Sequence, residues 1–176
     1  DFTANANNYI CEMVFDSGWL YVCGSFTQIN ASACGRVTRL NPATGEPDPA
    51  WTNGADDRIS GMAVTPTAVY VGGDFANIGG VARAYLAKLD KTNGRPVPGW
   101  NPGASLYVFA LHADDEFLYT GGNFDTLGGR PIANAGRISL NTGVVDTNWA
   151  PMPNGTVYGV ISQPPYVALF GLFNQV

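Results

Sequence analysis

Residues 69–75 read VYVGGDF, and residues 118–124 read LYTGGNF, 49 positions further along the chain. Phenylalanine recurs at this interval throughout the sequence, at Phe26, Phe75, Phe124 and Phe173. Tryptophan keeps the same interval at Trp51, Trp100 and Trp149. Landmarks that hold one spacing without insertions indicate tandem repeats, and a period near fifty residues is typical of β-propeller blades.

Each repeat contains several short segments that are typical of β-strands. In the second repeat, residues 59–64 form an apolar run, and residues 69–75 are rich in β-branched and aromatic side chains. Residues 84–89 alternate with a period of two, and the turn at 91–94 leads to a short fourth segment that ends near Trp100. The pattern predicts an all-β fold, a β-propeller of four-stranded antiparallel blades with about three and a half blades present.

The whole chain is interpreted as part of one propeller domain spanning residues 1–176. Its repeats run roughly over residues 8–56, 57–105 and 106–154, with a partial repeat at 155–176. Three whole blades and a fraction fall short of the roughly four needed for ring closure. We therefore expect the remaining blades to come from the same protein or from another chain, and two half-propellers closing one ring is the alternative arrangement.

The recurring residues have structural roles that require no ligand. The pairs Gly72-Gly73 and Gly121-Gly122 are expected to allow a bulge or a close approach between blades. The recurring phenylalanines are expected to pack between blades, and so are Trp51, Trp100 and Trp149. The alternative for the tryptophans is an exposed aromatic platform for sugar rings, as a carbohydrate-binding propeller would use.

Composition and charge exclude some classes of partner. The formal net charge is −5, with 9 Lys and Arg against 14 Asp and Glu, so no basic surface is available for nucleic acid. No apolar run approaches the ~20 residues that span a bilayer, so we expect no membrane insertion. The first residue is Asp1, which indicates a processed or partial product.

The three cysteines, Cys11, Cys23 and Cys34, all lie in the first repeat. Cys11 and Cys23 sit symmetrically about the turn at residues 16–18, which would place them opposite each other on a hairpin, and Cys23 with Cys34 is the competing pair. A disulfide among these residues would imply an oxidising compartment. Three buried reduced thiols are the alternative.

No motif points to catalysis, a cofactor or a metal. His112 is the sole histidine, so a Ser/His/Asp triad would have to use it, and a solvated loop histidine is the simpler interpretation. The acidic groups at 56–57 and 114–116 could flank a glycosidic bond or hold a hard cation, but both lie at or near loops, where solvated charge is the ordinary outcome. Asp74 and Asn123 are expected to accept backbone hydrogen bonds at a strand end. We therefore expect a protein that is not an enzyme and that has no catalytic, cofactor-binding or metal-binding residues.

The phrases at residues 69–75, 78–80, 86–90 and 100–104 resemble the delta-60 type β-propeller repeat, a family with blades of the kelch or WD40 kind. The resemblance covers the chain, although the first repeat has Cys23 and Cys34 where the second has Gly72 and Arg83, and the last repeat lacks the Gly-Gly pair. Members are mostly large secreted or surface-attached bacterial proteins. The resemblance implies an extracellular, cell-surface or virion setting and supplies no catalytic residues.

These observations predict a non-enzymatic propeller module that mediates binding, adhesion or assembly. Its expected partners are other protein chains or the remaining blades of the same protein. One alternative is a carbohydrate-binding or glycoside-processing propeller, which needs exposed aromatic side chains in each blade or two carboxylates about 5 to 10 Å apart. A purely structural subunit of a filament or particle is the other.

Overall fold

The computed structural model describes all 176 residues and contains fifteen β-strands and no helix. The strands that pair within the blades do so in antiparallel fashion. The prediction of an all-β propeller is therefore confirmed. The structure has no helix long and apolar enough to cross a membrane.

Each of the first three repeats forms one three-stranded sheet, and the fourth forms a hairpin. The first blade consists of β1 (Ile10–Asp16), β2 (Trp19–Gly24) and β5 (Val37–Leu40). The second consists of β6 (Ile59–Val64), β7 (Ala68–Gly73) and β10 (Leu86–Asp90), and the third of β11 (Val108–Ala113), β12 (Phe117–Gly122) and β13 (Ala135–Ser139). The last contains β14 (Val157–Gln163) and β15 (Tyr166–Gly171).

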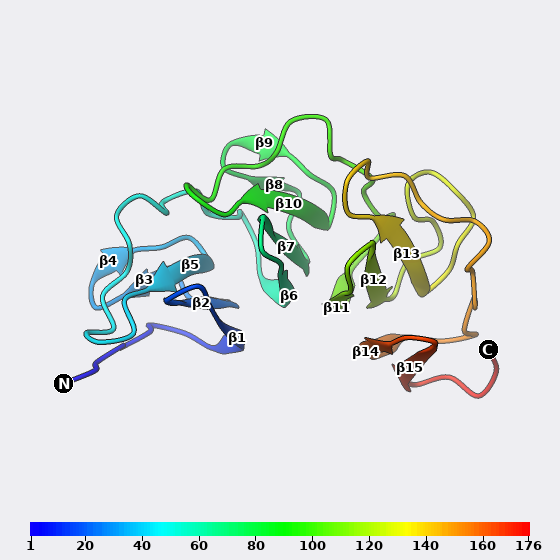
Figure 1. Ribbon diagram of the computed structural model, residues 1–176, viewed down its shortest axis with the longest axis horizontal. Coiled ribbons are helices and arrows are strands. Elements are labelled where there is room, and N and C mark those ends of the chain that lie inside the picture. The colour runs from blue at the N-terminus through cyan, green and yellow to red at the C-terminus, as the bar shows by residue number, and fades with distance from the viewer.

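A small hairpin interrupts the path from the second strand to the third. It is formed by β3 (Gln28–Ile29) with β4 (Ser32–Ala33) in the first blade, and by β8 (Asn77–Ile78) with β9 (Val81–Ala82) in the second. In the third blade a single bridge between Leu127 and Arg130 takes its place. These hairpins lie at the outer part of the blades (Figure 1).

The fourth strand of each of the first three blades is reduced to a short bridged segment. Leu40 bridges Pro47, Leu89 bridges Pro96, and Ile138 bridges Val145. Proline has no backbone N–H to donate, which keeps the pairing short in the first two blades. The connecting turn closes through Gly45, which has a φ of 82° and donates its N–H to the carbonyl of Asn41 at 2.8 Å.

Each innermost strand carries a β-bulge one residue after its start. In β1 the pairing passes from Ile10 opposite Gly24 to Glu12 opposite Cys23, so Cys11 has no partner across the hairpin. The same shift occurs in β6, β11 and β14, at Ser60, Phe109 and Tyr158. A bulge leaves one residue outside the ladder, and here it does so at equivalent positions of all four blades.

The four blades follow one another around an arc, with β1, β6, β11 and β14 facing its centre (Figure 1). Most of the core lies between blades, and a smaller cluster lies within the first blade. One cluster joins Tyr21, Cys23 and Val37 of the first blade to Met62 and Val71 of the second. Another joins the second blade to the third. Each sheet between two neighbours therefore buries one face against the preceding blade and the other against the following one.

Candidate functional site

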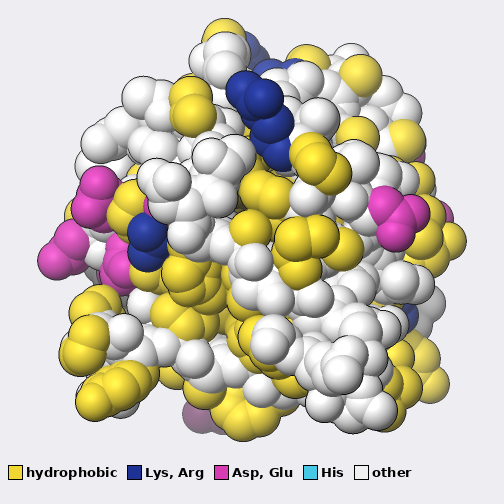
Figure 2. Space-filling view, turned by 90° about the vertical axis from the view of Figure 1, so that its right-hand side faces the viewer, with side chains coloured by type: hydrophobic (Ala, Val, Ile, Leu, Met, Phe, Trp, Pro, Cys, Tyr) yellow, Lys and Arg dark blue, Asp and Glu magenta, His cyan; other side chains and the backbone are white.

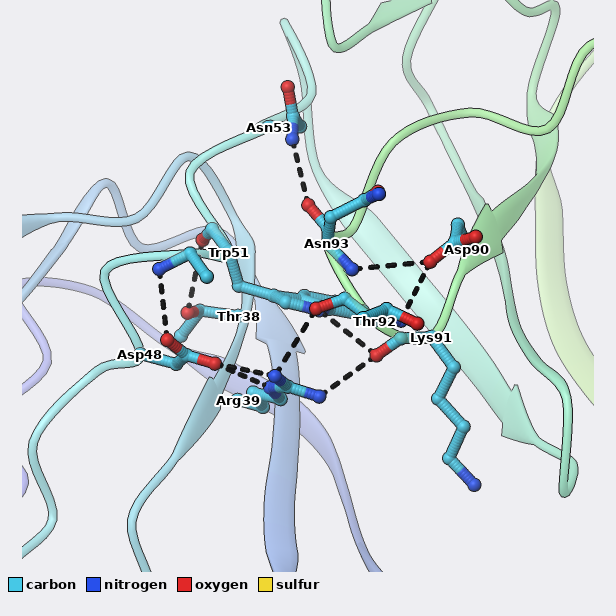
Figure 3. Close-up of polar contacts among 10 residues, drawn as sticks. Thr38, Arg39, Asp48, Trp51, Asn53, Asp90, Lys91, Thr92 and Asn93 are labelled. Atoms are coloured by element: carbon cyan, nitrogen blue, oxygen red, sulfur yellow. Dashed lines mark hydrogen bonds and ion pairs between the residues drawn. The ribbon is translucent and has the colours of Figure 1, made fainter.

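The junction between the first two blades is closed by a polar clamp (Figure 3). Arg39 of β5 bonds Asp48 through its Nε, 2.7 Å from Oδ2, and donates its Nη1 to the carbonyl of Lys91 at 2.9 Å. Trp51 donates its indole N–H to the same carbonyl at 3.2 Å. Lys91 lies in the outer turn of the second blade, so its carbonyl accepts two hydrogen bonds from the first blade.

The clamp recurs at the next junction with different partners. Trp100 donates its indole N–H to the carbonyl of Ser139 at 3.3 Å, and Lys88 donates to the carbonyl of Leu140 at 2.7 Å. Each tryptophan also meets a tyrosine of its own blade edge-on, at 5.5 Å for Tyr21 and 5.3 Å for Tyr70. Trp51 and Trp100 are buried, so neither forms an exposed platform for a sugar ring.

Trp149 occupies the same position in the third blade but is only half-buried. It meets Tyr119 edge-on at 5.3 Å, and Arg137 pairs with Asp146 beside it at 2.6 Å. The turn that receives the indole at the other two junctions is absent from the last blade, which has two strands. The environment of the tryptophan therefore depends on the following blade.

The recurring phenylalanines and glycine pairs also lie at packing positions. Phe26, Phe75 and Phe124 are buried, and Phe173 is half-buried. A Cβ added at Gly72 would meet the side chain of Val108 in the next blade, and one at Gly121 would meet the side chain of Val157. A Cβ at Gly73 would collide with the carbonyl of Arg58, and one at Gly122 with that of Tyr107.

The three cysteines are free thiols in this structure. The expectation that Cys11 faces Cys23 across the hairpin is corrected by the bulge, which puts Glu12 opposite Cys23 instead. Cys34 is buried and donates to the carbonyl of Ser32 at 3.1 Å. Burial raises the pKa of all three thiols, most strongly for Cys23, although Cys11 is exposed.

His112, Ser162 and Asp114 lie close together where the third and fourth blades meet, but they are not connected as a catalytic triad. The Nδ1 of His112 accepts the backbone N–H of Ser162 at 3.2 Å. The Ser162 hydroxyl lies 3.5 Å from Asp114, whose other bonds go to Tyr119 and to backbone amides of its own turn. A triad requires the hydroxyl to bond the imidazole. Here the three residues tie two blades together.

Among the acidic residues at 56–57 and 114–116, Asp56, Asp57 and Asp114 have structural partners. Asp56 accepts the backbone N–H groups of Ala76 and Asn77 at 2.9 and 3.0 Å, and Asp57 accepts that of Arg58. No group of three or more His, Cys, Asp or Glu side chains is arranged to hold a metal ion.

A row of aromatic rings that the repeat pattern did not reveal includes Phe109 on β11 and Tyr158 on β14, with Tyr107 and Tyr85 immediately before β11 and β10. Tyr85 meets Tyr107 edge-on at 5.8 Å, Tyr107 lies 6.0 Å from Phe109, and Phe109 lies 5.6 Å from Tyr158. Tyr107 and Tyr158 are exposed. The row crosses from the second blade to the fourth, and we call these four residues the inner aromatic row. The residue types at these positions change from one repeat to the next, so the repeat pattern gives no sign of the row.

A polar cluster lies at the start of β6 and the end of β7 in the second blade, nearer the first blade. Arg58 pairs with Asp74 at 3.0 Å, while Arg58 Nε, Asp74 Oδ1 and the Ser60 hydroxyl are buried without a hydrogen-bond partner. Both charges act on the thiol of Cys11, the bulge residue of β1. Ser60 is the bulge residue of β6, equivalent to Phe109 in the third blade. The inner surface therefore changes from polar to aromatic along the arc.

The two ends of the arc leave sheet faces uncovered. Met13 and Phe15 are exposed on β1 of the first blade. On the last blade, Ile161 and Phe170 are exposed, together with Tyr166. Figure 2 views the molecule from the side of the third and fourth blades, at the right of Figure 1, and shows hydrophobic side chains interspersed with uncharged ones and few charged side chains.

Comparison with known proteins agrees with this architecture. The model of a family described as a domain of unknown function (DUF5122) beta-propeller matches residues 17–50 and 69–96, which is less than half of the chain. The matched residues lie in the first two blades. No curated protein matches the sequence.

Two computationally designed proteins have similar structures. The Ika4 protein has a TM-score of 0.64 at 11% identity, over 94% of this chain and 86% of that one. The Ika8 protein has a TM-score of 0.57 at 14% identity, over 94% of this chain and 44% of that one. At these identities the likeness shows the fold alone.

Proposed function

We propose that the chain is a non-enzymatic β-propeller module of a secreted, cell-surface or virion protein, and that it works by binding further blades or other protein chains. The observation that carries the proposal is a comparison between repeats. Met13 of the first blade is 60% exposed, whereas Met62, at the same position of the second blade, is 1% exposed. Met62 is covered by the blade that precedes it, whereas no blade covers Met13 in this structure.

The same comparison holds at the opposite end of the arc. Cys23 and Val37 of the first blade are buried against the second, whereas Phe170, at the position of Cys23, is exposed on the last blade. Covering a large apolar side chain contributes about 1.5 to 3 kcal/mol. Exposed apolar faces of this kind mark interaction surfaces. A blade with the packing pattern of this chain is the occupant that fits both ends.

The extracellular setting rests on the resemblance of the repeat phrases to delta-60 type repeats, whose members are mostly secreted or surface-attached. The non-enzymatic assignment is supported by the arrangement of the titratable residues. His112, Ser162 and Asp114 bond to backbone or to each other in a structural pattern. Asp56 and Asp114 are engaged by backbone amides of nearby loops.

Sedimentation equilibrium of the 176-residue chain tests the proposal. We expect association that grows with concentration and a mass above the 18.6 kDa of one chain. Phe15→Glu places a charge on the uncovered face and should weaken association at least tenfold. Val144→Glu is the matched control, because Val144 is equally exposed but lies in an outer turn away from both end faces. A wild-type chain that stays monomeric, or two variants that behave alike, would contradict the proposal.

The same measurement separates closed assembly from open-ended growth. A defined dimer would support two half-propellers that close one ring. Growth into long oligomers would favour the alternative of a purely structural subunit of a filament or particle, since head-to-tail contacts that do not close produce filaments.

Carbohydrate binding is the second candidate, and the inner aromatic row is the observation that favours it. The exposed rings of Tyr107 and Tyr158 lie about 6 Å on either side of the half-buried Phe109 and offer aromatic surface on which sugar rings pack. A panel of immobilised oligosaccharides would test it, with Tyr158→Ala expected to lose binding at least tenfold. Tyr166→Ala is the control, because Tyr166 is exposed on the same blade but outside the row. Absence of binding across the panel would remove this candidate.

A further inference from the structure

Arg83 is a buried arginine without a carboxylate partner. It follows β9, and only 8% of its surface is exposed. The four ion pairs of the chain are formed by other residues: Arg39, Arg58, Lys91 and Arg137 with their aspartates. A charge removed from water is costly unless it is paired, so a buried arginine at this position is unusual.

The hydrogen bonds of the guanidinium leave most of its capacity unused. Nη1 donates to the carbonyl of Ala82 at 2.9 Å, and Nη2 donates to that of Val97 at 3.3 Å. Nε has no partner. A guanidinium has five N–H donors, and carbonyl dipoles compensate its charge less than a carboxylate would.

The fold itself does not require an arginine here. The equivalent residues are Cys34 in the first blade and Ile132 in the third, 1% and 3% exposed. Cys34 belongs to an apolar cluster within the first blade, and Ile132 belongs to the cluster shared by the second and third blades. A hydrophobic side chain therefore satisfies the packing at this position twice in the same chain, and Arg83 departs from that pattern.

Arg83 also lines a cavity of about 370 Å³ between the loops of the second and third blades. Ala84, Asn101 and Gly103 contribute to its wall, and the backbone N–H groups of these three residues donate no hydrogen bond within the protein. No Asp or Glu lines the cavity. An adjacent hollow shares Asn101 and adds the exposed Arg130. The surroundings are rich in donors and free of negative charge.

We propose that this cavity binds a small oxyanion, a carboxylate, sulfate or phosphate group, against the guanidinium of Arg83. The planar guanidinium matches two oxygens of such a group, and free backbone amides supply further donors. The bound anion would supply the counter-charge that the protein lacks here. This inference does not depend on the assembly proposed above.

Calorimetric titration with sodium sulfate, sodium phosphate and sodium acetate tests the proposal, with sodium chloride at matched ionic strength as the baseline. We expect saturable binding of at least one oxyanion to the wild-type chain. Arg83→Ile, which installs the residue of the third blade, should lower the affinity at least tenfold. Arg95→Ile is the matched control, because it removes the same charge from an exposed arginine and should leave binding unchanged.

Circular dichroism shows whether the variants are folded, and Arg83→Cys provides a second variant that installs the residue of the first blade. Removing an unpaired buried charge in favour of an apolar side chain is expected to leave stability unchanged or raised. A wild-type chain that binds none of the three anions saturably would overturn the proposal. So would binding that Arg83→Ile and Arg83→Cys leave intact.

Discussion

Trp51→Ala is the substitution that probes the blade junction most sharply. The side chain is buried, it meets Tyr21 edge-on at 5.5 Å, and its indole bonds the carbonyl of Lys91 at 3.2 Å. That carbonyl keeps its bond from Arg39 at 2.9 Å after the substitution, so no buried acceptor is left without a partner. The cost is therefore that of lost packing and a cavity, about 3 to 5 kcal/mol.

The third blade offers a matched substitution. Trp149 has the same edge-on tyrosine, at 5.3 Å, but is only half-buried and has no following turn to receive its indole. We expect Trp149→Ala to cost about 1 to 2 kcal/mol. The difference between the two variants measures what the following blade contributes.

Urea unfolding followed by far-ultraviolet circular dichroism measures both free energies without depending on tryptophan fluorescence. In a chain of 176 residues, a loss of 3 to 5 kcal/mol corresponds to a fall in Tm of roughly 6 to 20 °C. Equal losses for Trp51→Ala and Trp149→Ala would refute the reasoning, because they would show that the next blade adds nothing. So would a loss below about 1 kcal/mol for Trp51→Ala.

Three further predictions concern stability, acid unfolding and thiol reactivity. Gly73→Ala should destabilise the fold by roughly 3 kcal/mol in urea unfolding, because its Cβ meets a backbone carbonyl that cannot move aside; a loss under about 1 kcal/mol would contradict this. The backbone N–H of Asn148, together with Arg137, holds the pKa of Asp146 below its usual value. The ionised Asp146 stabilises the fold above the unfolded-state pKa near 4, and this stabilisation is lost as the pH falls through the folded-state pKa. Asp146→Asn should therefore flatten the acid limb of a curve of unfolding free energy against pH. An unchanged slope there would count against the pairing. Iodoacetamide should label Cys11 in the folded chain and reach Cys23 and Cys34 only after unfolding; mass spectrometry that finds Cys34 modified as fast as Cys11 would show that the core is open.

The architecture could be predicted because local sequence patterns determine it, and those patterns recur in each repeat. Phe75 and Phe124 mark one period, and the apolar alternation within a period identifies the strands. Gly72 and Gly121 indicated a close approach between blades, because glycine inside a strand is typical of a bulge or of a neighbouring backbone that comes near. The short fourth strand that the sequence predicted is a single bridge at Pro47 and at Pro96, because proline has no N–H to extend the pairing.

The candidate sites could not be predicted for two physical reasons. The bulge in β1 moves Cys11 out of register, and no local pattern announces the extra residue, so Cys23 was expected opposite the wrong partner. The inner aromatic row unites Tyr107, Phe109 and Tyr158 from two blades, and its positions vary between repeats. Arg83 did carry a signal, because it stands where the other repeats have an apolar residue, but its burial is known only from the fold.

The uncovered faces of the first and last blades are, in our proposal, docking faces with the geometry of the internal junctions. A Cβ at Gly72 would lie 3.0 Å from the Cβ of Val108, and one at Gly121 would lie 3.3 Å from the Cβ of Val157. Continued by one more blade, the same step pairs Phe170 with Ile10 of another copy. The Cβ–Cβ separation at these junctions is close to the Cβ–Cβ separation across a disulfide.

The decisive measurement is oxidative cross-linking of the chain carrying Ile10→Cys and Phe170→Cys, with Cys11→Ser to remove the exposed native thiol. We predict a covalent product of two or more chains, formed through these two positions and identified by mass spectrometry. A control in which Val144→Cys replaces Phe170→Cys should remain uncross-linked. Failure of the first variant to cross-link, or equal cross-linking by the control, would contradict the claim.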